Sequence, residues 1–234
     1  MTKHALWIGD AQRRNSALIF TGDEAKHAMR VKRVRVGERI LGLDGAGTLV
    51  EGEVTSLGKE LTVEIIETTE APAPYPAIEV WAPTPKGTRS GDLVDTLTQV
   101  GAASWVPMRT NRSVSSLSEA KRARLVRVAV EACKQSRRAW LLEIAREASL
   151  AQALDCDDGT ALVIAEQSGE VVDAAQVGDA DRIRLLIGPE GGFTEEEIAQ
   201  AKQAGASVRS LGPHVMRIEV AAAIGCAALV GARR

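Results

Sequence analysis

The chain has 234 residues, of which 45% are hydrophobic, 26% charged and 3% aromatic. This is the composition of an ordinary soluble globular protein with one large domain or two small ones. The formal net charge of -2 gives no overall attraction to a polyanion, so any nucleic-acid surface must come from local clusters of charge. Three cysteines without CxxC spacing and three scattered histidines argue against a disulfide framework and a metal site. The chain begins without an apolar signal core and has no apolar run of about 18 residues, so we expect a cytoplasmic protein with no membrane partner.

The first third of the chain is typical of short strands separated by turns. Apolar or β-branched runs are bounded there by Gly, Asp or Asn, and Asp44-Gly45 is a favourable hairpin turn. The predicted strands are Ala5–Ile8, Leu18–Thr21, Arg39–Leu43, Leu49–Leu57 and Leu61–Ile66. Strands this short and evenly spaced indicate a small barrel.

A proline-rich segment follows these strands. Glu70–Pro76 holds three prolines in seven residues. Alternate prolines disfavour both a helix and a central strand, so the segment predicts a stiff linker and a domain boundary. We therefore predict a first domain of residues 1–73 and a second of residues 74–234.

The second domain alternates between predicted strands and predicted helices. The strands are Ile78–Ala82, Trp105–Met108, Ala161–Ala165, Ile183–Ile187 and Val208–Leu211. The helices are centred on Leu93–Val100, Ser118–Arg138, Ile198–Lys202 and Glu219–Val230. This alternation predicts an α/β domain with a mostly parallel sheet that helices cover on both faces.

The strongest local signal is the glycine-rich segment Leu185–Thr194. A buried strand runs into three glycines within five residues, and Thr194 with Glu197 then predicts a capping box. Glycine lets the backbone approach a ligand closely, and ligands bind at the carboxyl ends of strands in open α/β sheets. A tight turn without a ligand would use the same residues. The segment is neither a Walker loop nor a GxGxxG motif.

A second loop of this kind, Leu211–Glu219, also follows a strand and precedes a helix. Gly212-Pro213 restricts its backbone, and Arg217 lies near the start of the last helix. Alone, this loop is better explained as an ordinary helix-start loop with a charged pair. Two such loops at adjacent strand ends would form one cleft, which favours a functional interpretation of both.

With these loops the chain resembles the 16S rRNA uracil-N3 methyltransferases, the ribosomal RNA small subunit methyltransferase E family of the SPOUT superfamily. The resemblance is carried in chain order by His27, Arg30, Val31, Arg33, Gly37, Lys86-Gly87, Gly101-Ala102, Ala132–Ser136, Arg138, Ile187–Thr194, Leu211–Pro213, Arg217, Glu219 and Ala221. Similar proteins usually carry Arg at the position of His214, Thr or Ser at those of Ile218 and Val220, and Glu at that of Gln99.

The resemblance implies a PUA-like β-barrel that helps to hold RNA, followed by a SPOUT α/β domain with a deep trefoil knot, a feature that proteins otherwise nearly lack. It also implies S-adenosyl-L-methionine as the cofactor and no metal. The implied partners are 16S ribosomal RNA or the small ribosomal subunit, and a second copy of the chain in a homodimer with the cofactor sites at its interface.

From the loops and the resemblance we predict three sets of site residues. The cofactor-binding residues are Glu166, Ile187, Gly188, Pro189, Glu190, Gly191, Gly192, Leu211, Gly212, Val215 and Met216. The RNA-binding residues are Arg30, Arg33, Lys86, Arg112 and Arg138. The catalytic residues are Arg217, which would stabilise negative charge on the uracil carbonyl oxygens, and Glu219, which would orient Arg217 or help to remove the N3 proton.

Two basic segments support an RNA partner independently. Residues 26–39 hold six Lys or Arg residues and one Glu, and residues 119–138 hold seven Lys or Arg residues, including Lys134, and two Glu. A charge run is usually a solvated face, but two of them in an acidic chain favour surfaces that contact phosphates.

The expected reaction is methyl transfer from the sulfonium of S-adenosylmethionine to N3 of a uracil, which must lose its proton and leave the base stack. Two alternatives stay open. A related SPOUT enzyme that methylates a ribose 2′-hydroxyl of tRNA or rRNA would share the cofactor loops, although Pro189 and the pattern from Leu211 to Arg217 favour the base-N3 group. A non-catalytic RNA-binding ribosome assembly factor is compatible with His214 and Ile218.

Overall fold

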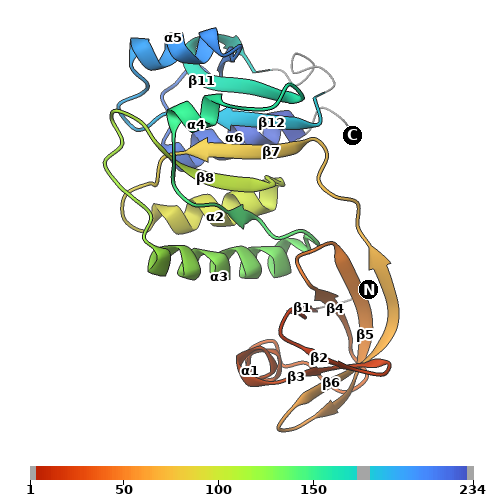
Figure 1. Ribbon diagram of the computed structural model, residues 1–234. Helices are drawn as coiled ribbons and strands as arrows, with labels where there is room; N and C mark the ends of the chain where they lie inside the picture. Colours follow the sequence, from red (N-terminus) through yellow and green to blue (C-terminus); the bar gives the residue numbers. More distant parts are fainter. Residues whose placement is uncertain (1–3, 173–179, 231–234) are drawn as a thin grey trace. The chain divides into compact units, whose positions relative to one another are not determined.

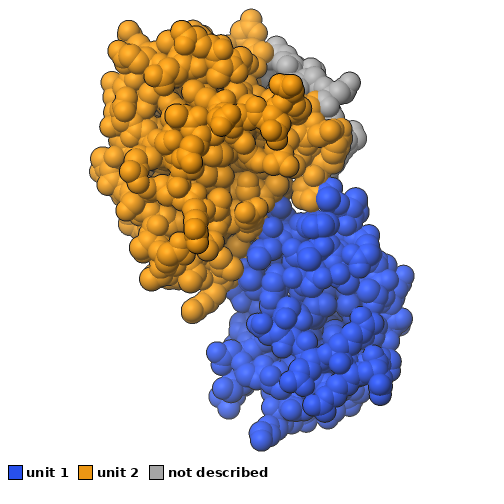
Figure 2. All heavy atoms as spheres, viewed as in Figure 1, with its two compact units in different colours: residues 1–73, 130–141 blue, residues 74–129, 142–234 orange. Residues whose placement is uncertain are grey.

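A computed structural model describes residues 4–172 and 180–230 of the chain (Figure 1). The chain forms two compact units (Figure 2). The first unit runs up to Ala73 and also includes Val130–Leu141, and the second contains Pro74–Ala129 and the chain from Leu142 onward. The return of 130–141 to the first unit has no counterpart in the division predicted from sequence, because no break in composition marks it.

The first unit is built on one six-stranded sheet with the order β1-β4-β5-β6-β3-β2. Its elements are β1 (His4–Trp7), β2 (Gln12–Arg14), β3 (Ala17–Phe20), α1 (Gly22–Arg30), β4 (Arg39–Leu43), β5 (Thr48–Leu57) and β6 (Leu61–Glu70). The pair β1 and β4 is parallel, and the other pairs are antiparallel. Alternating residues from the strands, such as Leu61 and Val63, enclose a core that Ala25 and Ala28 of α1 complete.

The predicted hairpin after Leu43 is confirmed, with a connection of residues 44–47 between β4 and β5. Asp44 Oδ1 accepts hydrogen bonds from the backbone N–H groups of Ala46 (2.7 Å) and Thr48 (3.0 Å), which fixes this turn. Helix α1 was not predicted, because its nine residues lie in a region of short strands and their charges suggested a basic surface.

Segment 130–141 contains the end of α3 (Glu119–Ser136) and belongs to the first unit, where hydrogen bonds of Trp140 and a buried ion pair of Lys134 hold it. The side chain of Lys134 is only 2% exposed, and its Nζ lies 2.9 Å from Glu24 Oε2 of α1. Glu24 Oε1 also accepts the backbone N–H of Trp7 at 2.9 Å. The prediction that Lys134 belongs to a phosphate-contacting surface is therefore wrong, because a buried, paired ammonium cannot reach RNA. The pKa of Lys32 is lowered, first by its burial and next by the positive charge of Lys134. The Nζ of Lys32 donates a hydrogen bond to the backbone carbonyl of Ala5.

The second unit is an α/β layer structure, as predicted. Its elements are β7 (Ala77–Ala82), α2 (Arg89–Val100), β8 (Ser104–Arg109), most of α3, β9 (Glu143–Ile144), β10 (Ala148–Ser149), α4 (Leu150–Leu154), β11 (Thr160–Val171), β12 (Arg182–Leu186), α5 (Glu195–Gln203), β13 (Ser207–Ser210) and α6 (Ile218–Val230). The strands lie in the order β10-β8-β7-β12-β11-β13, with β9 also paired to β8, and all the described pairs are parallel.

Helices cover both faces of this sheet (Figure 1). Leu186 of β12 packs in one hydrophobic cluster with Ala153 of α4 and Ala201 of α5. Its neighbour Leu185 points to the opposite face and packs on α6, where a Cβ added to Gly225 would lie 2.8 Å from Leu185 Cδ2. Helix α6 packs in turn on α2. The central strands are thus buried on both sides, which explains their continuous apolar runs. The trefoil knot stays a prediction.

No helix in the described part of the chain combines the length and apolarity needed to cross a membrane.

Candidate functional site

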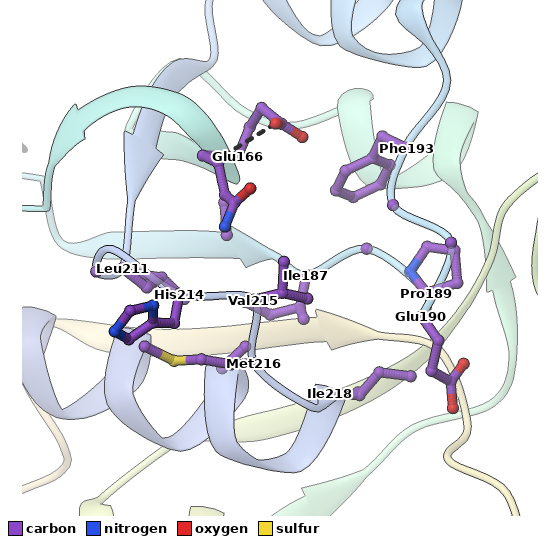
Figure 3. Close-up of a pocket in the computed structure, with 17 residues that line it drawn as sticks. Glu166, Ile187, Pro189, Glu190, Phe193, Leu211, His214, Val215, Met216 and Ile218 are labelled. Atoms are coloured by element: carbon purple, nitrogen blue, oxygen red, sulfur yellow. Dashed lines mark hydrogen bonds between the residues drawn. The ribbon is translucent and has the colours of Figure 1, made fainter.

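A cavity of about 310 Å³ lies beyond the carboxyl ends of β12 and β13 and beside the middle of β11 (Figure 3). Three segments supply its walls: one within β11 and one after each of β12 and β13. The lining residues are Ala165, Glu166, Gln167, Ile187, Gly188, Pro189, Glu190, Gly191, Gly192, Phe193, Leu211, Gly212, His214, Val215, Met216, Ile218 and Ala221. The two predicted loops therefore share one cleft, as expected for ligand sites in open α/β sheets.

The prediction that these loops follow adjacent strands is wrong, because β11 lies between β12 and β13. Strand β11 pairs with Arg209 of β13 through both Ala165 and Glu170, so residues 166–169 leave the ladder as a bulge. Gly169 allows this close approach, since a Cβ there would lie 2.6 Å from the carbonyl oxygen of Val208. The bulge adds a third wall, which includes Glu166, to the cavity.

The glycines of the first loop let the backbone turn tightly around the cavity. The N–H of Ile187 donates to the carbonyl of Trp81 at 2.8 Å, and that of Gly192 donates to the carbonyl of Pro189 at 2.8 Å. Gly192 has a φ of +69°, which favours glycine. A Cβ on Gly188 would lie 3.1 Å from the buried ring of Phe193, so only glycine fits there without displacing the ring.

The buried carboxylate of Glu197 fixes the end of this loop through hydrogen bonds to the backbone. The predicted capping box is confirmed: Thr194 Oγ1 accepts the N–H of Glu197 (3.2 Å), and Glu197 Oε2 accepts the N–H of Thr194 (2.8 Å). The other carboxylate oxygen, Oε1, accepts the N–H of Asn111 at 2.8 Å, and Arg112 Nη1 donates to the carbonyl of Gly191 at 2.5 Å. The segment after β8 thus fixes the glycine loop, a contact that the sequence did not signal because its partners are about eighty residues apart.

The second loop is held at its start by Ser210, whose Oγ accepts the N–H of Gly212 at 3.3 Å. Gly212 has a φ of +148°, and a Cβ there would lie 3.2 Å from Met216 Cε. The apolar side chains of Leu211 and Met216 and the exposed Val215 project into the same cavity as Ile187 (Figure 3). The cavity thus combines apolar walls with a few polar groups and backbone amides, the usual character of a small-molecule site.

All eleven residues predicted to bind the cofactor line this cavity. The predicted catalytic residues lie outside its lining. The side chain of Arg217 is exposed, and its carbonyl accepts the N–H groups of Val220 and Ala221 at the start of α6. Glu219 is largely buried, and its carboxylate lies near Arg89 of α2.

The residues predicted to bind RNA are spread over both units. Arg30 and Arg33 are exposed in the first unit, where Arg138 is half-buried. Lys86 and Arg112 are exposed in the second. Sequence reasoning did not assign six of the lining residues to the cofactor site: Ala165, Gln167, Phe193, His214, Ile218 and Ala221. Phe193 and Ala221 belong to the motifs that carried the resemblance. Across the described ranges, no group of three or more His, Cys, Asp or Glu side chains could hold a metal ion.

Comparison with known proteins places the chain in a family. Residues 71–230 match the family model of an RNA methyltransferase domain, and residues 20–66 match that of an RNA methyltransferase PUA domain. The ribosomal RNA small subunit methyltransferase E of Mycobacterium bovis is 30% identical to the chain over 228 residues, which cover 90% of this chain and 85% of the relative. The chain belongs to the ribosomal RNA small subunit methyltransferase E family.

Members of this family from other bacteria match over similar lengths. The Synechocystis protein of the same name is 26% identical over 233 residues, covering 96% of this chain and 76% of the relative. The crystal structure of the Neisseria gonorrhoeae ribosomal RNA small subunit methyltransferase E bound to S-adenosyl methionine superposes with a TM-score of 0.83 and 24% identity, covering 96% of this chain and 95% of that one. The predicted fold class, a PUA-like domain followed by a SPOUT α/β domain, is confirmed.

Proposed function

We propose that the protein uses S-adenosyl-L-methionine to methylate N3 of one uridine in 16S ribosomal RNA, U1498 in the numbering that the family implies. The cavity carries this proposal, because all the predicted cofactor residues line it in a chain that belongs to this family. The relative from Neisseria gonorrhoeae, which has the same fold, was crystallised with S-adenosyl methionine. We place the reaction in the cytoplasm, as a step of rRNA processing during ribosome biogenesis.

The residues around the cavity fit this cofactor. Its volume of about 310 Å³ lies at the lower end of the range for small-molecule sites. Leu211 and Met216 offer apolar contacts for a flat ring, and backbone groups of Gly188–Gly192 offer hydrogen bonds. When bound, the cofactor supplies a methyl group that its sulfonium has already activated. The protein's task is then to position the base and exclude water.

Arg217 is the proposed catalytic residue. Its side chain extends into solvent just after the loop that lines the cavity. A guanidinium placed there stabilises the negative charge that develops on the uracil carbonyl oxygens as N3 loses its proton. Glu219 is proposed to assist, either by orienting Arg217 or by taking up that proton. Among the described residues its ion-pair partner is Arg89.

Nucleoside analysis tests the proposed reaction. 16S rRNA from a strain without this gene should lack N3-methyluridine at one position, and the complemented strain should regain it, as measured by mass spectrometry. Calorimetry with S-adenosylmethionine should show binding to the isolated protein. Absence of binding would favour a non-catalytic assembly factor, and a lost 2′-O-methyl group would favour the ribose enzyme.

We propose that residues 1–73 form the RNA-binding domain and residues 74–234 the methyltransferase domain. Replacing Arg30 and Arg33 together by alanine should weaken RNA binding and lower the slope of log affinity against log salt by about two, because each lost phosphate contact removes about one. Both side chains are exposed in the first unit, whereas the cofactor cavity belongs to the second. Affinity for S-adenosylmethionine should therefore stay unchanged.

Arg39→Ala is the matched control for this double variant. Arg39 is exposed in the same basic segment, but its Nη1 lies 3.1 Å from Glu51 Oε1, so its charge is already paired and its loss should change the slope less. Filter binding over a range of salt concentrations measures both slopes. An unchanged slope in the double variant would remove Arg30 and Arg33 from the RNA-binding surface.

We also propose a homodimer formed partly through α6. On one side of this helix, the side chains of Ala222, Cys226 and Leu229 are fully buried within the second unit. Val220 and Ile224, one turn apart on another side, stay 42% and 40% exposed. Residues four positions apart on a helix lie on the same side, so these two side chains give α6 an exposed apolar surface on which a second copy can pack.

Aspartate at both Val220 and Ile224 should convert the dimer to a monomer, because the interface would then bury two unpaired charges. Light scattering at micromolar concentration measures the mass, and Leu57→Asp, on a partly exposed leucine of the first unit, is the control. A monomer mass for the unmodified protein would contradict the dimer.

A further inference from the structure

We propose that Arg89 is a positioning residue for the reaction: its guanidinium ties together the two loops that line the cavity. It does so by pairing with Glu190 of the first loop and with Glu219, which follows the second. This inference rests on the proposed function, because the cavity that the two loops enclose is the proposed cofactor site.

The geometry places one guanidinium between two carboxylates from separate segments. Arg89 is the first residue of α2, and its Nη2 lies 3.4 Å from Glu190 Oε1. Its Nη1 lies 3.9 Å from Glu219 Oε2. The carboxylate of Glu190 points away from Phe193 and out of the cavity (Figure 3), so Arg89 acts on the loop from outside. Three elements that are distant in sequence are thus linked through one side chain.

The burial of Glu219 gives this link its importance. Its side chain is 12% exposed, and its Oε2 is buried without a hydrogen-bond partner. A carboxylate in such a place is unfavourable unless a positive charge compensates it. In the part of the chain that the structure describes, the ion-pair partner of Glu219 is Arg89, whose side chain is 28% exposed. Without Arg89, Glu190 and Glu219 would lose the ion-pair partner that they share in the described part of the chain.

Helix α2 does not need Arg89 in order to fold. Leu93, Val94 and Leu97 are fully buried on its inner side. Its start is fixed by the Oγ of Ser90, which donates to the carbonyl of Pro85 at 3.0 Å. Arg89 instead contacts Glu190 of the first loop and Glu219 after the second. Its loss should therefore change the positions of the loops that hold the cofactor, and not the folding of α2. A displacement of about 1 Å is enough to impair a preorganised site.

The chemistry of arginine suits this position. Its planar fork presents separate N–H groups to two acceptors at once, whereas lysine offers a single compact charge. We therefore expect Arg89→Met to lower the affinity for S-adenosylmethionine about tenfold, and Arg89→Lys to recover part of that loss. Neutralising the buried carboxylate should also compensate: in the double variant Arg89→Met with Glu219→Gln, most of the affinity should return.

The experiment measures cofactor affinity by calorimetry for the wild type, the three single variants Arg89→Met, Arg89→Lys and Glu219→Gln, and the double variant. Steady-state kinetics with 16S rRNA separates the effects, because Arg89→Met should raise the KM for the cofactor and leave RNA affinity unchanged. Arg182→Met is the matched control: it removes another ion pair of the same unit, with Glu79, and should leave cofactor affinity at the wild-type level. If Arg89→Met does not fold, the same comparison is made with Arg89→Lys.

The outcomes are distinct. Recovery of cofactor affinity in the double variant supports the link when thermal melting shows that Arg89→Met is itself fully folded at the assay temperature, because the loss of affinity then does not come from unfolding. If the wild type binds and methylates while Arg89→Met binds equally well, or if the two substitutions are simply additive, the inference on Arg89 is overturned and the proposed function stands. If the wild type does not bind S-adenosylmethionine, the proposed function fails and this inference fails with it.

Discussion

Replacing Arg217 by alanine will slow methyl transfer by about 10²–10³-fold, the usual cost of losing one oriented group that stabilises charge in the transition state. RNA and S-adenosylmethionine will still bind. The side chain of Arg217 is exposed and lies outside the cavity lining, so its loss neither opens the cavity nor uncovers the core. Single-turnover methylation with both ligands saturating isolates this step from binding.

The local structure around Arg217 should survive the substitution. The backbone carbonyl of Arg217, not its side chain, accepts the N–H groups of Val220 and Ala221 that start α6. Alanine keeps that carbonyl. Arg182→Ala, which removes an exposed arginine elsewhere in the same unit, is expected to methylate normally. A rate near the wild-type value for Arg217→Ala would show that the mechanistic role is wrong, even though the chain belongs to the family.

Replacing Gly191 by valine will abolish measurable binding of S-adenosylmethionine in a folded protein. Gly191 lines the cavity, and a Cβ there would already lie 3.3 Å from Arg112 Cδ. The two further methyl groups of valine add to this crowding beside the cavity. Since Arg112 donates to the carbonyl of Gly191, a shift of its side chain weakens the bond that fixes the loop. Calorimetry measures the affinity, and thermal melting shows whether the protein is folded.

Gly159→Val is the matched control for this substitution. Gly159 lies in the same unit just before β11, and an added Cβ would meet nothing within 4 Å. This variant should bind the cofactor like the wild type. If Gly191→Val is folded and keeps its affinity, the cofactor does not occupy this cavity as proposed.

The sequence alone predicted features that depend on neighbouring residues. The hairpin after Leu43, the capping box of Thr194 with Glu197 and the two glycine loops each follow from side chains within a few positions of one another. The alternation of apolar strands and helices likewise determined a parallel sheet, because strands buried on both faces need continuous apolar runs. The two loops hold ten of the eleven predicted cofactor residues, and all ten line one cavity.

Only the tertiary structure decided which distant segments meet. It inserted β11 between the two strands whose loops were predicted to be neighbours, and so brought Glu166 to the cavity wall. It showed that Lys134, which the sequence suggested as a surface charge, is buried and paired with Glu24. It also showed that Arg89, at the start of α2, lies between Glu190 and Glu219. Each of these three pairs joins residues that are more than 100 positions apart in the sequence. No local periodicity encodes such contacts, because strand order and long-range packing, rather than the spacing of residues along the chain, bring the charges together.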